Sequence, residues 1–332
     1  MQRLPSFVLL ACLASLPAAA KAAPPACARS EAAAPALERL RSALAQGRFV
    51  AYEPTSLQVR DGRVHDAEAD SIRADLTVLR SRFDGLITYD AVHGAQQIAP
   101  IAAQLKFRAL IIGVWNPLEP SEIAAALATA HSYPQLVAGV SLGNETLFFH
   151  RADVAQLAAA FAAVRTHAPW LPLTTTEPFH IFEAAPGSAL LPHMDFMLAN
   201  VHPVFQSWFR GSTDAGTAAQ FVVNVADQLA ESYCGPILIK ETGMPTAPAE
   251  AGYSNLRQAT FYKELRTRLP PRPLIAFAYF SAFDAPWRLQ DATGIAGPHP
   301  EEAYWGLYDS ARRPKPAVDQ LALLAQDPRS RN

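Results

Sequence analysis

The sequence predicts a single α/β domain folded as a (β/α)8 (TIM) barrel, with a short helical extension before it. Eight short apolar runs of strand length alternate along the chain with segments of helical periodicity. Most of these runs are continuously apolar, as expected for parallel strands that are buried on both faces. Eight such units within roughly 280 residues match the size of a closed barrel. An open doubly wound sheet rarely needs eight parallel strands, and no glycine-rich dinucleotide motif follows the first run.

The N-terminal segment has the features of an export signal. Arg3 supplies a positive charge, residues 7–16 form an apolar run, and small residues follow it. We expect a signal peptide over residues 1–22, cleaved after Ala20 or Ala22, and therefore a secreted or periplasmic protein. A buried N-terminal helix and a lipoprotein signal are the alternatives.

An extension over residues 23–47 precedes the barrel. Its amphipathic segment Ala34–Leu44 is expected to form a helix that packs across the barrel bottom. Cys27 lies in this extension, and Cys234 lies just before the seventh strand, at the same end of the barrel. Paired cysteines are typical of an oxidising compartment, so we expect a disulfide between them. Two unrelated thiols are the alternative.

The barrel itself is expected over residues 48–328. In chain order its predicted strands are Phe49–Tyr52, Gly85–Tyr89, Ala109–Trp115, Val137–Leu142, Leu171–Thr176, Phe196–Val201, Pro236–Lys240 and Ile275–Phe280. The predicted helices between them are Asp66–Phe83, Ser121–His131, Asp153–Thr166, Thr217–Ser232 and Asn255–Arg268. The segment Ile181–Leu191 is short and interrupted by Pro186-Gly187, and a last helix over Lys315–Ala325 is expected to close the ring.

Composition excludes several function classes. Charged residues make up 17% of the chain and the formal net charge is -2, whereas nucleic-acid binders usually carry a strong basic excess. No metal-site or phosphate-loop motif is present. We therefore expect a monomer that works without a cofactor or metal, and that binds neither nucleic acid nor, once the signal is removed, a membrane.

Polar residues follow the predicted strands at their carboxyl ends, where a TIM barrel builds its active site. They are Glu53, Tyr89-Asp90, Trp115-Asn116, Gly143-Asn144-Glu145, Thr176-Glu177, Asn200-Val-His202, Lys240-Glu241-Thr-Gly243 and the run ending in Asp284. Glu145 and Glu241 end the fourth and seventh strands, on opposing sides of the barrel mouth. Two carboxylates that face each other across a cleft are what glycoside hydrolysis needs. Lys240 should point to the other face of its strand and not pair with Glu241.

Two strings resemble the catalytic strands of glycoside hydrolase family 17. Val140-Ser-Leu-Gly-Asn-Glu145 resembles the acid/base strand, and Ile237-Leu-Ile-Lys-Glu-Thr-Gly-Met-Pro-Thr246 resembles the nucleophile strand. Further similar strings are Tyr89-Asp90, Asn200-Val-His-Pro-Val-Phe205, Tyr279–Trp287 and Glu302–Leu307, the last two in the form of the bacterial and fungal branch. The resemblance covers most of residues 49–317. It implies a retaining enzyme for β-1,3-linked glucan, with Glu145 as acid/base and Glu241 as nucleophile.

The chain departs from the family pattern at three positions. Met244 stands where the family usually has tryptophan, and Ala276 and Ala285 stand where plant members have further acidic residues. The plant-type arrangement of sugar subsites therefore does not transfer, and the linkage stays open. Whether water or a sugar hydroxyl ends the reaction, giving hydrolysis or transglycosylation, also stays open.

Several residues near the predicted mouth are candidate sugar contacts. Asn144 lies beside the acid, where its amide could bond a sugar 2-hydroxyl. The other candidates are Tyr89, Asp90, Trp115, His202, Phe205, Trp208, Asp284, Trp287 and Trp305. Tyr304 is a further aromatic residue that could stack on a sugar, Glu53 and Glu177 are weaker candidates, and Trp170 is expected to be structural. A place in the core is the alternative for each buried aromatic residue and for His202.

Two other functions compete with the glycosidase interpretation. Gly139-Val-Ser-Leu-Gly143 matches the nucleophile elbow of serine esterases, with Ser141 as nucleophile. That elbow needs a sharp turn at the serine, whereas Ser141 lies inside an apolar strand. A non-catalytic carbohydrate-binding barrel is the second alternative, although such barrels usually lose a catalytic acid and both acids are present here.

Overall fold

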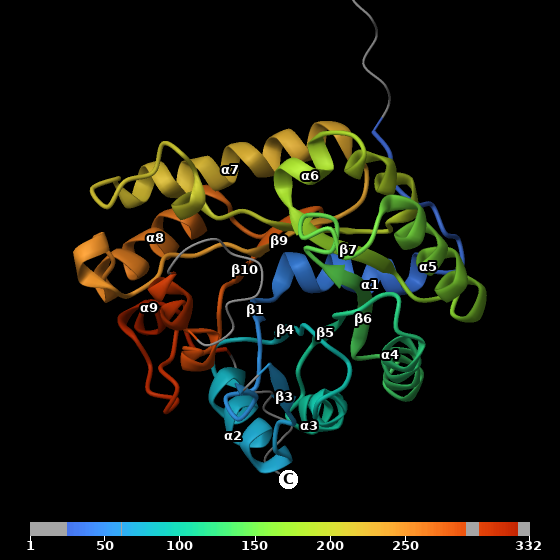
Figure 1. The fold of residues 1–332 in the computed structure, drawn as a ribbon, viewed down its shortest axis with the longest axis horizontal. Coiled ribbons are helices and arrows are strands. Elements are labelled where there is room, and N and C mark those ends of the chain that lie inside the picture. The colour runs from blue at the N-terminus through green and yellow to red at the C-terminus, as the bar shows by residue number, and fades with distance from the viewer. Residues whose placement is uncertain (1–24, 61, 290–298, 325–332) are drawn as a thin grey trace, which may run out of the picture.

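A computed structural model describes residues 25–60, 62–289 and 299–324. Eight parallel strands close into a barrel, in the order β1-β4-β5-β6-β7-β8-β9-β10 and back to β1 (Figure 1). The strands are β1 (Phe49–Ala51), β4 (Gly85–Ile87), β5 (Ala109–Val114), β6 (Val137–Asn144), β7 (Leu173–Pro178), β8 (Met197–Asn200), β9 (Ile237–Glu241) and β10 (Ile275–Tyr279). Each predicted strand overlaps an observed one, so the predicted barrel is confirmed. The predicted signal segment lies outside the described residues.

Helices follow the strands around the outside of the barrel (Figure 1). They are α2 (Ala69–Arg80), α3 (Ile98–Gln104), α4 (Pro120–Ser132), α5 (Val154–His167), α6 (Phe179–Glu183), α7 (Ala215–Ser232), α8 (Asn255–Arg268) and α9 (Pro316–Asp319). Caps fix several of their starts: Asp153 and Gln156 form a capping box at α5, and Ser254 accepts the Arg257 N–H at α8. Among the described residues, no helix has the length and apolar character needed to cross a membrane.

Three elements differ from the prediction. Helix α3 and the antiparallel hairpin β2 (Gln58–Arg60) and β3 (Arg63–His65) were not predicted. The last helix is wrong in extent, because α9 stops at Asp319. Beyond it the backbone bonds to the end of α2 instead: Arg82 donates to the Leu321 carbonyl, and the Leu324 N–H donates to the Ser81 carbonyl.

Two apolar layers stabilise the barrel. The outer layer lies between the strands and the helices, and the inner layer fills the lower half of the barrel. Inner side chains come from alternate strand positions, such as Phe49, Phe196 and Leu238, as the two-residue period of a strand requires. Gly139 leaves room for Phe196, because a Cβ at this glycine would lie 2.6 Å from the ring.

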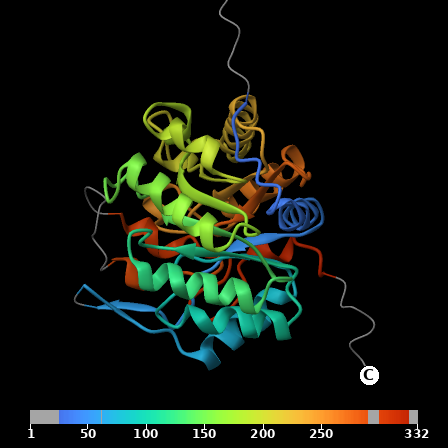
Figure 2. The same cartoon turned by 90° about the vertical axis from the view of Figure 1, so that its right-hand side faces the viewer.

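Helix α1 (Ala34–Gln46) closes the bottom of the barrel, as predicted. Figures 1 and 2 together show this blue helix across one end of the ring of strands. Its buried side chains Leu40, Ala43 and Leu44 join the inner apolar layer. Cys27, in the segment before α1, forms a disulfide with Cys234, with Cα atoms 5.5 Å apart. Because α1 covers this end of the barrel, only the opposite end, where the carboxyl ends of the strands lie, is open to form a site.

Candidate active site

A cleft of about 550 Å³ opens at the carboxyl ends of the strands and contains both predicted carboxylates. Glu145 follows β6 and Glu241 ends β9. The other lining residues are Glu53, Tyr89, Trp115, Asn144, Phe148, Phe149, Pro178, Phe179, His180, Asn200, His202, Phe205, Gln206, Phe280, Trp287, Arg288, His299, Glu302 and Trp305. They come from nearly every strand end, as the barrel topology predicts.

The end of β6 is shaped to present Glu145. The register with β7 shifts between Ser141 and Asn144, and Gly143 takes a φ of 98°, which favours glycine. Glu145 itself has a φ of 53°, a left-handed conformation that is uncommon for a non-glycine residue and clusters at functional sites. Its N–H donates to the Thr176 carbonyl at 2.7 Å, so the turn stays attached to β7.

The end of β8 holds both carboxylates. The amide nitrogen of Asn200 donates to Glu145 Oε1 at 2.9 Å. His202 Nε2 lies 3.4 Å from Glu241 Oε2. Asn200 and His202 are two residues apart, and side chains at that spacing share one face of an extended chain. One strand end thus orients the two glutamates from one side.

The two glutamates have opposed electrostatic environments. Burial, and next the negative charge of Glu241, raise the pKa of Glu145. Burial also disfavours ionisation of Glu241, but the charge of Lys240, the hydrogen bond and charge of His202, and the charge of Arg288 outweigh it and lower the pKa of Glu241 to about 2. At neutral pH Glu241 is therefore ionised, and Glu145 is the carboxyl group that holds a proton more readily.

The prediction that Lys240 points away from Glu241 is wrong. Lys240 Nζ lies 3.3 Å from Glu241 Oε1 and donates to Asn144 Oδ1 at 2.6 Å. The cause is a register shift: Ala199 pairs with Ile239, but Asn200 pairs with Glu241, so Lys240 is an extra residue in β9. Strict alternation fails at such a bulge, and the lysine enters the barrel interior.

Aromatic rings form one wall of the cleft. The imidazole of His202 packs against Phe205, Phe280 and Trp305, with ring centroids 5.2 to 5.4 Å apart. Phe205 is 47% exposed, so its ring is available to a ligand, whereas Trp305 is 1% exposed and supports the histidine. On another wall, the exposed Trp115 stacks under the guanidinium of Arg151 at 4.4 Å.

Two buried carboxylates outside the cleft lining hold its loops in place. Glu122 accepts the N–H groups of Trp115 at 2.6 Å and Asn116 at 2.9 Å. Glu177 accepts the N–H groups of Leu147 at 2.8 Å and Phe148 at 3.2 Å. Glu177, a weak candidate from the sequence, therefore braces the loop after Glu145 instead of lining the cleft.

A salt bridge lies at the β1 side of the cleft. Arg288 Nη2 contacts Glu53 Oε2 at 2.7 Å, and Arg288 Nη1 contacts Glu302 Oε2 at 3.4 Å. The guanidinium also lies 5.6 Å from the ring centroids of Phe280 and Trp287. This bridge connects segments that are distant in sequence, and it adds charged groups to a wall that is otherwise aromatic.

The structure brings most of the predicted sugar contacts into the cleft. Tyr89, Trp115, Asn144, His202, Phe205, Trp287 and Trp305 all line it. Three candidates lie outside its lining. Asp90 pairs with His93 Nδ1 at 2.8 Å, Trp208 packs on Phe221, and Asp284 accepts from Lys315 Nζ at 2.7 Å. Tyr304 also lies outside, and Met244, where the similar family has tryptophan, is fully buried.

The sequence did not lead us to name several cleft residues as sugar contacts. They are Phe148, Phe149, Phe179, His180, Asn200, Gln206, Phe280, Arg288, His299 and Glu302. Asn200 had a usable signal, because it stands in the string that resembles the family's sixth strand. The loop aromatics had none, since loops carry no periodic pattern that separates exposed rings from buried ones.

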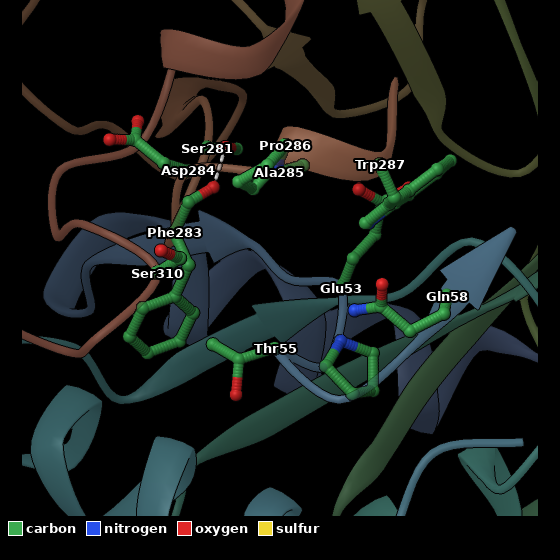
Figure 3. A pocket seen from close by; sticks show the side chains of 11 residues that line it. Glu53, Thr55, Gln58, Ser281, Phe283, Asp284, Ala285, Pro286, Trp287 and Ser310 are labelled. Atoms are coloured by element: carbon green, nitrogen blue, oxygen red, sulfur yellow. Dashed lines mark hydrogen bonds between the residues drawn. The ribbon is translucent and has the colours of Figure 1, made fainter. Parts of the chain in front are cut away.

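A smaller pocket of about 230 Å³ adjoins the cleft and shares Glu53 and Trp287 with it. Figure 3 shows Glu53, Gln58 and Trp287 grouped on one side of this pocket and Phe283 and Ser310 on the other. Asp284 lines this pocket, although its Oδ1 is engaged by Lys315 and by the Gly306 N–H.

Three buried polar atoms of cleft residues have no hydrogen-bond partner within the described part of the chain. They are Tyr89 Oη, Asn200 Oδ1 and His202 Nδ1. Glu241 Oε1 lies 3.3 Å from Lys240 Nζ but makes no well-formed hydrogen bond there. Buried polar atoms are nearly always satisfied, and exceptions in a cleft point to a missing ligand or water. A polyhydroxylated ligand such as a sugar offers both donors and acceptors to this set.

Ser141 is not placed as an esterase nucleophile. It is 2% exposed within β6, and its hydroxyl donates to the Gly143 carbonyl at 3.1 Å and contacts Thr176 Oγ1 at 3.0 Å. The nucleophile elbow instead presents its serine at a strand-to-helix turn.

Several known proteins are similar to this chain in sequence. A family model described as BtgE/BtgC glycoside hydrolase domain matches residues 50–306. A protein of Arthroderma benhamiae named glucan 1,3-beta-glucosidase is 26% identical over 276 residues, covering 78% of this chain and 85% of that protein. A probable beta-glucosidase btgE of Aspergillus clavatus is 27% identical over 72% of this chain, which spans only 42% of that protein's length.

Solved structures show the same fold. A glycoside hydrolase family 17 β-1,3-glucanosyltransferase from Rhizomucor miehei has a TM-score of 0.61 at 20% identity, covering 81% of this chain and 95% of that one. An endo-laminarinase from Formosa has a TM-score of 0.61 at 18% identity, covering 79% of this chain and 83% of that one. Both likenesses concern the barrel as a whole.

Proposed function

The chain belongs to the BtgE/BtgC glycoside hydrolase family, and we propose that it cleaves or rearranges β-1,3-linked glucan with retention at the anomeric carbon. The observation that carries this proposal is the pair of cleft glutamates with opposed pKa shifts, one raised and one lowered. A retaining glycosidase needs one carboxylate and one carboxylic acid at the same bond. The names of the similar proteins, a glucan 1,3-beta-glucosidase and a β-1,3-glucanosyltransferase among them, support β-1,3-glucan as the substrate.

In the first step, a carboxylate oxygen of Glu241 attacks the anomeric carbon of the bound sugar. The glycosidic carbon–oxygen bond breaks, and the proton of Glu145 moves to the departing oxygen. The products are a sugar ester on Glu241 and a shortened glucan. Asn200 and His202 keep the two groups in position through their contacts with Glu145 and Glu241.

In the second step, a hydroxyl group attacks the same carbon from the other side. Its proton moves to Glu145, now a carboxylate, and the ester bond to Glu241 breaks. Water as the attacking group gives hydrolysis, and a sugar hydroxyl gives transglycosylation. The aromatic residues Phe148, Phe149 and Phe179 line the cleft and offer surfaces on which an acceptor sugar could stack.

A product profile tests this function. The protein is incubated with purified β-1,3-gluco-oligosaccharides, the products are resolved by size, and Glu241→Ala serves as the control. Products longer than the input that are absent with the variant support a transglycosylase, and shorter products alone support a hydrolase. No turnover of this or other β-glucans would leave the binding-barrel alternative.

We also propose that the protein is exported after removal of residues 1–22. The Cys27–Cys234 disulfide supports this, because such bonds persist in oxidising compartments. Mass spectrometry of protein recovered from a secreting host should find a mature N-terminus at residue 21 or 23. An intact Met1 on the active protein would contradict export through a cleaved signal.

A further inference from the structure

We propose that Lys240 is a positioning residue that fixes the amide of Asn144, so that its nitrogen faces the sugar held at Glu241. The proposal rests on the glycosidase function above. It gives Lys240 a role beyond those of the two glutamates in the proposed reaction.

Lys240 is inside the barrel, directly below the cleft. Its side chain is 2% exposed, and its ammonium group meets three neighbours. Nζ donates to Asn144 Oδ1 at 2.6 Å, lies 3.3 Å from Glu241 Oε1, and lies 4.0 Å from the ring centroid of Tyr89. All three neighbours line the cleft.

The contact with Asn144 decides which way its amide points. An ammonium group only donates hydrogen bonds, so it can bond the amide oxygen but not the amide nitrogen. The two ends of an amide are otherwise nearly interchangeable in shape. With Oδ1 turned toward Lys240, Nδ2 is the end of Asn144 left for a ligand. A donor at this position suits the 2-hydroxyl of the sugar bonded to the nucleophile.

Fold stability gives no reason for a lysine here. Burying an ammonium group costs free energy that pairing only partly offsets, and apolar replacements of buried ion pairs are often neutral or stabilising. The unbranched side chain of methionine would fill much of the same space. A charged donor at this site is therefore better explained by its effect on Asn144 and Glu241 than by packing.

The same lysine acts on the charge of the nucleophile. The groups around Glu241 and Lys240 are His202, Arg288, Glu145, Tyr89 and Glu53. The charge of Lys240 is the largest single influence that favours the ionised form of Glu241, and the hydrogen bond and charge of His202 and the charge of Arg288 act in the same direction. Loss of the ammonium group should thus raise the pKa of Glu241, while loss of the donor should release the amide of Asn144.

Two substitutions separate these effects. Lys240→Met removes both charge and donor, and Lys240→Gln removes the charge but keeps a donor for Asn144. Lys263→Met, at an exposed position on α8, is the matched control. The substrates are 4-nitrophenyl β-laminaribioside and its analogue without the 2-hydroxyl on the sugar next to the nitrophenol. Each variant is measured for kcat/KM on both substrates across pH, with a thermal melt to establish folding.

The proposal predicts that the acidic limb of kcat/KM moves to higher pH in both Lys240 variants. The 2-hydroxyl preference is the ratio of kcat/KM on the substrate with the 2-hydroxyl to kcat/KM on the analogue without it. In Lys240→Met this ratio should fall by at least about tenfold, which is within the usual effect of one lost hydrogen-bond donor. Lys240→Gln should keep most of that preference, and Lys263→Met should resemble the unaltered protein in both measurements.

Other outcomes overturn the proposal. The deciding one is an unchanged 2-hydroxyl preference in Lys240→Met, whether or not the acidic limb of kcat/KM moves. If only Lys240→Gln folds, a lost 2-hydroxyl preference or an unmoved acidic limb overturns the proposal, and if neither variant folds, Lys240 is a structural residue. If the unaltered protein acts on neither substrate nor on any β-glucan, the glycosidase function fails first. If the unaltered protein turns over β-glucan, Glu241→Ala abolishes that turnover and the Lys240 variants behave like the unaltered protein, then only this inference is refuted and the glycosidase function stands.

Discussion

The two glutamates of the cleft have the same side chain but different neighbours. Glu145 is largely withdrawn from water beside the charge of Glu241, and its side chain accepts a hydrogen bond from the neutral amide of Asn200. Glu241 lies between the ammonium group of Lys240 and the imidazole of His202. Because cations stabilise a carboxylate and burial destabilises it, the two pKa values separate. That separation is what one acid and one nucleophile require.

The pH dependence of activity should reflect this separation. Glu241 must be ionised, and its pKa of about 2 places the loss of activity on the acid side well below that of an ordinary glutamate. Glu145 must be protonated, and its raised pKa extends activity to higher pH than an ordinary glutamate would allow. The measurement is kcat/KM against pH. In Glu145→Gln, assayed on a substrate with a good leaving group, the alkaline limb should vanish, and a persistent limb would assign it to another group.

The acid/base role of Glu145 has its own test. Glu145→Ala should lose activity by about 10² to 10⁴-fold on a glucan, the usual contribution of a general acid or base. On a substrate with a good leaving group, azide should restore turnover and form a β-glycosyl azide, because a small anion enters the space that the carboxyl group left. Glu241→Ala should not respond to azide in this way. Full activity of Glu145→Ala on glucan would contradict the assignment.

At the scale of elements, buried carboxylates connect strand ends to the loops above them. Asp75 on α2 is the most connected of these groups. It accepts hydrogen bonds from the Tyr52 hydroxyl at 2.9 Å, the Thr55 hydroxyl at 2.8 Å and Arg312 Nε at 2.6 Å. Asp75 is 0% exposed, so these bonds are shielded from water. They connect α2, the end of β1 and the segment before α9.

Removal of this carboxylate should be strongly destabilising. Asp75→Ala removes the carboxylate that pairs with Arg312 Nε and accepts from the Tyr52 and Thr55 hydroxyl groups. Breaking a buried charged pair costs about 3–5 kcal/mol of unfolding free energy. Urea denaturation would measure the loss. Asp227→Ala, at an exposed position on α7, is the control and should change stability by less than about 0.5 kcal/mol. A loss below about 1 kcal/mol for Asp75→Ala would show that the network contributes little.

The sequence predicted elements well where a regular period was present. The eight strands were predicted from their apolar runs, because strands buried on both faces leave a strong and simple pattern. The same reasoning failed at Lys240, because a bulge in β9 breaks the alternation that the argument assumed. It also failed at α9, because Arg82 donates to the carbonyl of Leu321, which a longer helix would have bonded within itself. Neither a bulge nor a distant hydrogen bond has a local signal in the sequence.

Among the site residues, too, some had a signal in the sequence and others had none. Glu145 and Glu241 were predictable because each ends an apolar strand in a distinctive string. Arg288 was not, because its partner Glu53 is far away in the sequence and only the closed barrel brings them together. Phe148 and Phe149 were missed since nothing in the sequence separates aromatic residues at a loop surface from those in the core.

At the scale of the whole molecule, the disulfide ties the chain's first described segment to the barrel bottom. Cys27 and Cys234 are 207 residues apart in sequence, so the bond restricts a large part of the unfolded chain. The double variant Cys27→Ser with Cys234→Ser should lose about 2–5 kcal/mol of unfolding free energy. Activity should persist, because the bond lies at the end of the barrel away from the cleft. Two free thiols in denatured, unreduced protein would refute the bond itself.

Closure of the barrel brings all of these features to one rim. Helix α1 blocks one end, and the strand carboxyl ends at the other carry the two glutamates, the aromatic walls and the buried lysine. The central claim is that Glu241 forms a covalent bond to the sugar.

Trapping that bond tests the claim most directly. The protein is incubated with a 2-deoxy-2-fluoro-β-laminaribiosyl fluoride, which forms the sugar ester quickly and releases it slowly. The anomeric fluoride leaves, and mass spectrometry should find one added 2-deoxy-2-fluorolaminaribiosyl group per protein, on the peptide that contains Glu241, and no addition to Glu241→Ala. An adduct on another residue, or no adduct on a protein that turns over β-1,3-glucan, would contradict the account.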